Sequence, residues 1–225
     1  MREILGRRRM TLSSMRNAAL TCAARWQWPV LPGTTCVGGR LPTLACSCGA
    51  ADCVVPGAHP ADPVLLAATT DPRMVSWWWS EQPYASLILA TGAPVDGGHA
   101  PCALSLPAVA GARALAEFDA CGVRVGPVAA TPTRWTLLVA PYGFEELGEL
   151  LNAHGAVPSS LRFHSDGGYV ALPPGLTGHG QVRWQREPSV EAEHGTPWLP
   201  RMETLVDVLV EASAAIPDPG STLAY

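Results

Sequence analysis

The chain has 225 residues, of which 48% are hydrophobic and 15% are charged, and its formal net charge is −4. This composition excludes a wholly disordered chain, and the acidic balance excludes a global positive field that would draw the protein onto nucleic acid. All 15 basic residues are Arg, and Lys is absent. The 22 Gly and 22 Pro favour many short elements joined by turns over a long-helix bundle.

The beginning of the chain is predicted to be a flexible basic leader over residues 1–12. Ser13 or Ser14 can cap the helix that follows, and residues 28–33 are typical of a short strand that leaves through a turn. Residues 33–63 are rich in Gly, Pro and Cys and show no periodicity, so we expect an insertion or loop there.

Asp71 predicts the start of a second helix, because Asp is a favoured N-cap and the Pro that follows it fits the first helical position. The spacing places Met74, Trp77 and Trp78 on the inward face and leaves Trp79 pointing outward. We therefore expect this tryptophan run to serve core packing rather than stacking on unpaired bases.

Strands and helices alternate further along the chain, and then a group of strands follows. The predicted strands are residues 86–90, 102–106, 123–128, 135–140, 161–164, 169–172 and 181–184, and the predicted helices are 108–120, 144–153 and 202–214. Ser-Asp-Gly-Gly between residues 161–164 and 169–172 predicts a hairpin. The pattern predicts one α+β domain over residues 13–215, with a mixed or antiparallel sheet flanked by helices, and a tail at 216–225.

No apolar run approaches the ~20 residues that a membrane-spanning helix needs, so we expect no membrane association. The basic leader lacks a clean export signal, and the predicted location is the cytoplasm. Seven cysteines are an odd number, and Cys46, Cys48 and Cys53 are clustered. This distribution indicates metal ligands or free thiols rather than a disulfide framework.

The clustered cysteines are followed by His59, which completes a set of three thiols and one imidazole within fourteen residues. One tetrahedral Zn²⁺ takes four such ligands, and the predicted insertion is therefore zinc-knuckle-like, with Cys46, Cys48, Cys53 and His59 as the metal ligands. Cys36 can replace one of them. The alternative is a loop of unliganded thiols.

Four segments, which together span roughly residues 15 to 185, share their order and spacing with a known family. They are Trp28-Pro29-Val30-Leu31-Pro32 after a helix; Cys46-Ser47-Cys48 and Cys53 before Pro56-Gly57-Ala58-His59-Pro60; Thr70-Asp71-Pro72 before Trp77-Trp78 and Ala90-Thr91-Gly92; and Asp166-Gly167-Gly168-Tyr169-Val170-Ala171-Leu172-Pro173-Pro174 before Val182-Arg183-Trp184. In these segments the chain resembles the N-terminal domain of bifunctional DNA primase/polymerases, the prim-pol domain. The resemblance implies an archaeo-eukaryotic primase-like fold.

The resemblance also implies nucleotidyl transfer with two divalent metals, which need Asp or Glu oxygens. In the family an apolar-Asp-apolar-Asp strand follows the Ala-Thr-Gly strand. Here the matching strand is residues 102–107, and Ser105 and Pro107 stand at the two acidic positions.

The other two family motifs are missing in the same way. A Ser-Gly-x-His motif that contacts nucleotide phosphate maps onto residues 130–136, which contain neither Gly nor His. The third motif ends in an Asp whose position is taken by Arg162. The resemblance with these departures predicts a pseudoenzyme that is deficient in nucleotidyl transfer, and Mg²⁺ or Mn²⁺ is expected only if activity remains.

An active primase/polymerase with relocated carboxylates is the alternative. Asp96 and His99 lie on a loop close to the lost pair, and Asp166 lies near the third motif, so these residues are candidates for a rebuilt catalytic site. However, Asp-Gly pairs are common in turns, where the Asp side chain caps the backbone. We therefore favour the interpretation that Asp96 and Asp166 are turn residues.

Arg134, Arg162 and Arg183 lie on neighbouring predicted strands. If they converge, they can bind phosphate without a metal, because a guanidinium matches phosphate bidentately. We therefore predict a nucleic-acid or nucleotide-binding module whose partners are single-stranded DNA or nucleotides. A non-catalytic scaffold for a replication protein is a further hypothesis. The sequence has no Walker motif, so we expect no helicase domain in this chain.

Overall fold

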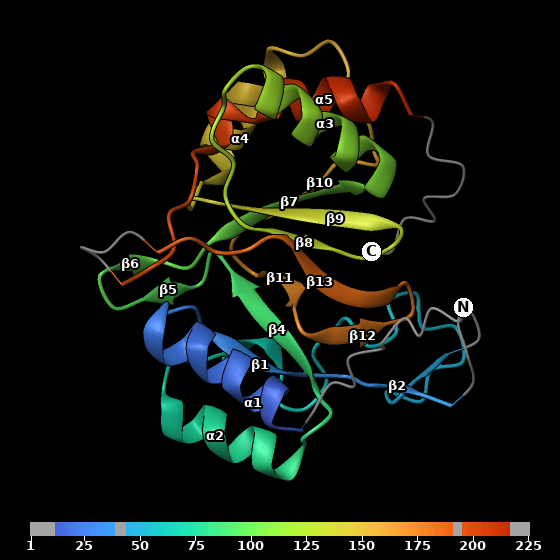
Figure 1. The fold of residues 1–225 in the computed structure, drawn as a ribbon, viewed down its shortest axis with the longest axis vertical. Helices are drawn as coiled ribbons and strands as arrows, with labels where there is room; N and C mark the ends of the chain where they lie inside the picture. Colours follow the sequence, from blue (N-terminus) through green and yellow to red (C-terminus); the bar gives the residue numbers. More distant parts are fainter. Residues whose placement is uncertain (1–11, 39–43, 191–194, 217–225) are drawn as a thin grey trace, which may run out of the picture.

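Two antiparallel β-sheets stack on each other between two layers of helices in the computed structural model, which describes residues 12–38, 44–190 and 195–216 (Figure 1). This architecture confirms the predicted α+β class. Every strand pair among the described residues is antiparallel. The basic leader up to residue 11 and the predicted tail from residue 217 lie outside the described residues.

The smaller layer pair consists of a three-stranded sheet in the order β1-β4-β11 and the helices α1 and α2. Their bounds are α1 Leu12–Leu20, continued by a π-helical turn at Thr21–Arg25; β1 Val30–Gly33; α2 Pro72–Glu81; β4 Ser86–Thr91; and β11 Gly168–Leu172. Asp71 begins α2 as predicted, since its Oδ1 accepts the backbone N–H of Arg73 at 2.9 Å. All six residues of β4 are buried, because this strand has a neighbour on each edge and a layer on each face.

The inward face of α2 differs from the prediction. Val75, Trp78 and Trp79 are buried, whereas Trp77 is 57% exposed and Met74 is 42% exposed. The helical spacing of the apolar residues was right, but its phase was wrong by one residue. Trp79 is held inside by its indole N–H, which donates to the carbonyl of Ala85 at 3.2 Å.

The larger layer pair consists of a six-stranded sheet in the order β10-β7-β9-β8-β13-β12 and the helices α3, α4 and α5. Their bounds are β7 Cys102–Pro107, α3 Ala108–Ala120, β8 Val128–Ala130, β9 Arg134–Val139, α4 Phe144–Asn152, β10 Arg162–His164, β12 Gly175–Thr177, β13 Gly180–Arg186 and α5 Val206–Ala214, with a 3₁₀ turn at Met202–Thr204 before α5. Along β7, Leu104 and Leu106 pack against the helices, whereas Ala103 packs toward the other sheet. Ser105 therefore also faces the other sheet, since strand side chains alternate.

Two strand predictions are wrong. The predicted hairpin at residues 161–172 does not form, because β10 pairs with β7 and β11 pairs with β4 in the other sheet. The turn crosses between sheets, where Thr91 Oγ1 donates to the Ser165 carbonyl at 2.7 Å. The strand predicted at residues 123–128 begins only at Val128, and the preceding Gly126 lies so close to Pro200 that an added Cβ would be 2.6 Å from its Cδ.

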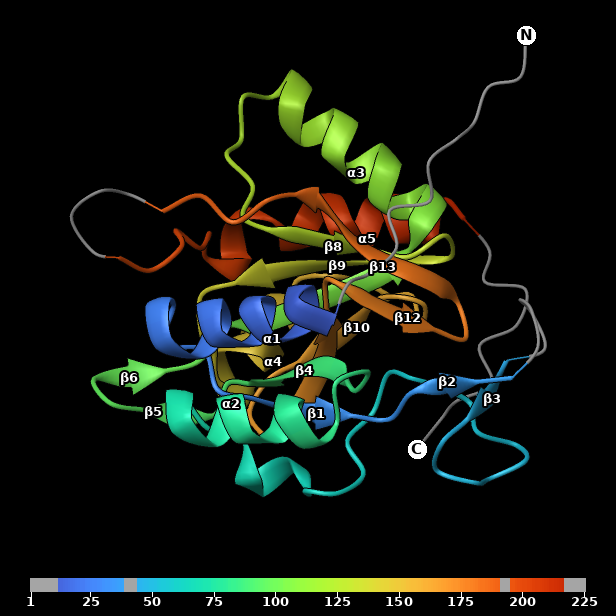
Figure 2. The same ribbon diagram turned by 60° about the horizontal axis from the view of Figure 1, so that its bottom comes forward.

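The remaining short elements lie at opposite ends of the molecule in two views. The two-stranded ribbon β2 Cys36–Val37 with β3 Ala45–Cys46 lies at one end, and the hairpin β5 Pro94–Val95 with β6 Gly98–His99 lies at the other (Figures 1 and 2). A 3₁₀ turn at Leu65–Ala67 precedes α2. Of the helices in the described residues, none is long and apolar enough to span a bilayer.

Candidate functional site

The predicted metal ligands lie together at the end of β3 and in the segment 47–59 that follows it; we call residues 46–59 the Cys/His loop. One ligand atom from each of Cys46, Cys48, Cys53 and His59 can be chosen so that all four lie within 4.8 Å of one another. His59 Nε2 is 3.3 Å from Cys46 Sγ and 3.5 Å from Cys53 Sγ. Zn–S and Zn–N bonds at a tetrahedral angle give an S···N separation of about 3.5 Å. The four side chains therefore fit a tetrahedral metal ion.

The orientation of His59 agrees with this role. Its Nδ1 lies 2.7 Å from the carbonyl of Pro60, which fixes the proton on Nδ1 because a carbonyl can only accept. The lone pair of Nε2 then points at the thiols. A ligating histidine commonly has such a partner on its other nitrogen, which fixes the tautomer and the ring orientation.

The thiols differ in their readiness to ionise. Burial alone raises the pKa of Cys46, but hydrogen bonds from Thr34, from the backbone of Cys48 and Gly57 and from the Cys48 thiol outweigh it and lower this pKa to about 6. Burial raises the pKa of Cys53 to about 11, and the neighbouring thiols Cys46 and Cys48 add to that increase. The loop therefore favours the thiolate of Cys46 over that of Cys53, and a bound cation would stabilise further negative charge there.

A second feature is a cavity of about 500 Å³ between the two sheets, open to solvent on one side. One wall comes from β7, β8, β9 and β10 of the larger sheet, and another comes from β11 of the smaller sheet. The β12–β13 turn and residues 54, 55 and 58 of the Cys/His loop close the remaining sides. We call this cavity the intersheet pocket.

All three stretches that match the family motifs contribute to the intersheet pocket. Ser105 of β7 pairs with Thr136 of β9 on one side and with Arg162 of β10 on the other, so the three lie in one row across the sheet. Arg134 pairs with Pro107, one step along the same face. Arg134 and Arg162 both line the pocket, and none of the described lining residues is Asp or Glu.

Arg134 fills the position next to Ser105. Its Nε donates to Ser105 Oγ at 3.0 Å, and its Nη2 donates to the carbonyls of Ser105 at 2.8 Å and of Ser160 at 2.7 Å. Ser105 Oγ also lies 2.8 Å from His164 Nε2. A guanidinium and a hydrogen-bonded serine therefore lie where the resemblance predicts metal-binding carboxylates.

The pocket is electropositive. Burial, then Arg134, then Arg162 lower the pKa of His164 to about 4, and the same three causes lower the pKa of His179. A divalent ion ~4 Å from one guanidinium is repelled by on the order of 8 kcal/mol at an effective dielectric constant of ~20. With no carboxylate among the lining residues to offset this repulsion, the arrangement favours an anion over Mg²⁺ or Mn²⁺.

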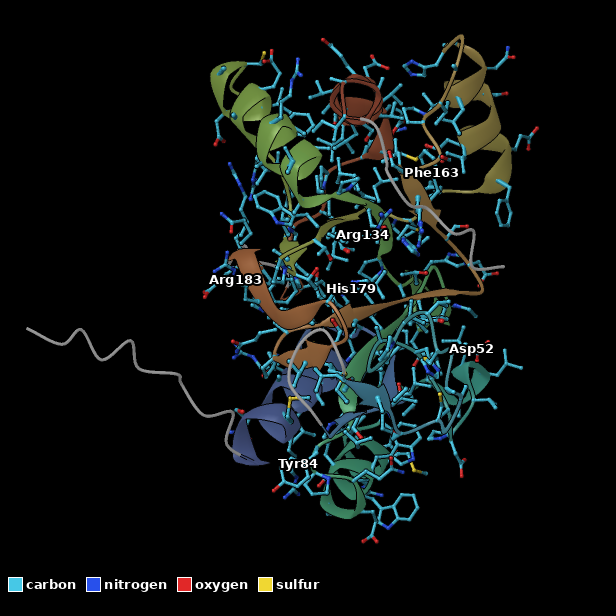
Figure 3. The ribbon with its side chains drawn as sticks, turned by 90° about the vertical axis from the view of Figure 1, so that its right-hand side faces the viewer. Asp52, Tyr84, Arg134, Phe163, His179 and Arg183 are labelled. Carbon is cyan, nitrogen blue, oxygen red and sulfur yellow. The ribbon has the colours of Figure 1, made fainter. Side chains whose placement is uncertain are left out.

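Arg183 does not join the other two arginines. It is exposed and does not line the intersheet pocket, whereas its neighbour Val182 does. Figure 3 shows Arg134 and His179 near the middle of the molecule and Arg183 at its edge. The structure thus brings together only Arg134 and Arg162 of the three predicted phosphate ligands.

The three candidate carboxylate and histidine residues lie elsewhere. Asp96 is exposed in the β5–β6 turn, where Gly97 has φ +84°. His99 and Asp166 line a separate cavity of about 370 Å³ together with Glu146. Among the described residues no group around Asp96, His99 or Asp166 comparable to the Cys/His cluster could hold a metal.

Sequence reasoning missed His179 as a pocket residue. It sits between two glycines in the β12–β13 turn, where its backbone N–H donates to Thr177 Oγ1 at 3.2 Å. The sequence Gly178-His179-Gly180 indicates a tight turn and could have identified His179 as a residue that is not part of the core. Its place beside the arginines depends on sheet stacking, which no local pattern predicts.

Comparison with known proteins gave one match. The family model described as bifunctional DNA primase/polymerase, N-terminal, matches residues 19–200. The matched range includes the Cys/His cluster and the whole intersheet pocket. No curated protein and no solved structure matches the chain.

Proposed function

The chain belongs to the family of bifunctional DNA primase/polymerase N-terminal domains, and we propose that it binds nucleotides or nucleic acid but does not catalyse nucleotidyl transfer. The proposed ligand is the phosphate of a nucleotide or of single-stranded DNA, bound in the intersheet pocket by Arg134 and Arg162. No divalent cation takes part in this binding.

One observation supports the proposal above all others. The resemblance places three acidic residues at the positions of Ser105, Pro107 and Arg162. Ser105 of β7 pairs with Arg162 of β10, and Pro107 lies two residues further along β7, where it pairs with Arg134. Two-metal catalysis needs carboxylate oxygens to hold both ions. Arg134 instead presents a fixed positive charge to the same space, and a guanidinium is a good phosphate ligand.

The pocket also suits the rest of a nucleotide. A volume of about 500 Å³ lies within the usual range for small-ligand sites. Most of its surface is apolar, and Tyr169 of β11 lines it opposite the arginines. An aromatic ring can stack on a base of any identity. Arg162 also lines the pocket, where a ligand can contact its guanidinium.

Two assays test the proposal. The full chain, freed of Mg²⁺ and Mn²⁺ by dialysis, should bind deoxyadenosine triphosphate (dATP) or a single-stranded thymidine decamer in a saturable way, and the stronger of the two identifies the ligand class. The same protein should yield no primer on a single-stranded template with Mn²⁺. Primer synthesis that is lost in Asp96→Ala or Asp166→Ala would overturn the proposal in favour of relocated carboxylates.

For the Cys/His loop, we infer that the bound metal is zinc in a structural role. Thiolates and a neutral imidazole are the ligands that Zn²⁺ takes in closed tetrahedral sites. The separations among the four side chains and the tautomer of His59 support the same assignment.

A further inference from the structure

We propose that metal binding by the Cys/His loop controls ligand binding in the intersheet pocket, because this loop is one wall of the pocket. The inference rests on the proposed function, since it concerns the phosphate ligand of that pocket. It adds a regulatory input from a metal that does not touch the ligand.

The wall residues lie between two of the metal ligands. Val54, Val55 and Ala58 line the pocket, and all three fall between Cys53 and His59 in the chain. A metal bond to each of these two side chains closes a short loop. Closing the loop fixes the backbone that carries the wall, and the metal supplies the free energy for that ordering.

The same segment docks onto the opposite side of the pocket entrance. The Pro56 carbonyl accepts the backbone N–H of Gly178 at 2.7 Å. Gly57 approaches β12 so closely that a Cβ at this position would lie 2.6 Å from the Leu176 carbonyl. The loop therefore supports the β12–β13 turn, which carries the pocket residue His179 beside the two arginines.

Besides the proposed metal, a few backbone hydrogen bonds hold this segment: the Thr34 N–H donates to the His59 carbonyl at 2.9 Å, and the Pro56 carbonyl accepts from Gly178. Residues 47–59 form turns and bends without helix or strand, and Val54 is 56% exposed. Neither hydrophobic core cluster contains a residue from 47–59, so metal bonds to Cys53 and His59 add a strong constraint to these few hydrogen bonds. Without the metal, the wall and the β12–β13 turn lose a defined position, and the ligand must order them on binding.

Linkage makes the effect reciprocal, since two ligands that stabilise the same arrangement raise each other's affinity by the same factor. We expect removal of the metal to weaken dATP binding about 5- to 50-fold, within the usual range of coupling between sites. Saturating dATP should raise the zinc affinity by that same factor.

The experiment measures dATP binding to the full chain in its zinc-loaded and zinc-free forms, with Cys53→Ser as a metal-deficient variant and Cys121→Ser as the control. The exposed Cys121 lies at the end of α3, outside the cluster. Weaker binding in the zinc-free form and in Cys53→Ser, with unchanged binding in Cys121→Ser, is the expected result. Equal dissociation constants in all four samples would overturn the inference.

A second measurement covers the case in which the zinc-free chain does not fold. Zinc is titrated out of the folded, loaded protein with a coloured chelator, with and without dATP. The chelator concentration at half release should rise with dATP in the wild type and stay constant in Arg162→Ala. If dATP binds but leaves zinc release unchanged, the coupling is wrong and the pocket assignment stands. If the loaded protein binds no dATP, the proposed function is wrong and the coupling with it.

Discussion

The Cys/His loop and the intersheet pocket are the two places where metal binding is expected, and they differ in whether their side chains can hold a metal ion. The Cys/His loop has four ligand atoms within 4.8 Å of one another and a histidine whose tautomer suits coordination. In the intersheet pocket, the resemblance predicts acidic residues at three positions of β7 and β10, where this chain has Ser105, Pro107 and Arg162. One family fold can therefore carry a cluster of metal-ligating side chains in one place and, under the proposed function, a site for an anion in another.

The largest expected effect concerns the loop. Cys46→Ser removes one of four ligands, and zinc affinity should fall at least about a hundredfold, or about 3 kcal/mol of a binding free energy of roughly 10–16 kcal/mol. Metal analysis of the purified protein should find close to one zinc per chain in the wild type and little in the variant. Cys121→Ser should keep its zinc, and a zinc-free wild type would remove the contrast between the two places.

The next effect concerns the pocket. Arg162→Ala should weaken dATP binding about 10- to 100-fold, since a hydrogen bond to a charged group contributes about 1.5–3 kcal/mol. Arg183→Ala removes an equal charge outside the pocket and should change the dissociation constant less than about twofold. Both values come from one titration series at fixed salt. Equal losses in the two variants would mean that only overall charge matters.

A smaller effect follows from His164. Its pKa is about 4 in the folded chain and about 6.5 when unfolded, so the unfolded state binds more protons between these values. Burying His164 is compatible with folding only while its imidazole is neutral. The part of the free energy of unfolding that depends on His164 is therefore highest above pH 6.5 and decreases as the pH falls toward 4. Between pH 7 and pH 5, the free energy of unfolding in urea should decrease by about 1–2 kcal/mol more in the wild type than in His164→Gln. The same decrease in both proteins would assign the loss to other groups.

The smallest effects are expected at the carboxylates outside both places. Asp96→Ala and Asp166→Ala should change dATP binding by less than about twofold, because neither side chain lines the intersheet pocket. A tenfold loss in either variant would show that these carboxylates serve the pocket after all. A gel-based assay of primer synthesis should show no product with the wild type or with either of these two variants.

The sequence predicted the Cys/His loop better than the pocket, and the reason is physical. Four ligands within fourteen residues must lie near one another in any compact loop, so their spacing alone predicted the cluster. The pocket depends on pairing between strands far apart in the chain. The family resemblance identified the positions of Ser105 and Arg162. That Arg134 lies beside Ser105 depends on the register between β7 and β9, which the sequence does not predict.

The wrong predictions share a cause as well. The Ser-Asp-Gly-Gly signal at residues 165–168 does mark a turn, but local sequence does not say whether the two flanking strands pair with each other. In α2 the spacing gave the period but not the phase, so Trp77 and Trp79 exchanged their expected faces. The prediction that Arg183 joins the other two arginines was wrong for a similar reason. Side chains alternate along β13, and Val182 is the residue that lines the pocket.

The central claim is that the intersheet pocket binds phosphate without a divalent cation. Calorimetric titration of dATP into zinc-loaded protein, first without Mg²⁺ and Mn²⁺ and then with excess Mn²⁺, tests it most directly. We expect saturable binding at one site per chain in both buffers, with dissociation constants that agree within about threefold and a large loss of affinity in Arg162→Ala. Binding that appears only with Mn²⁺ would contradict it.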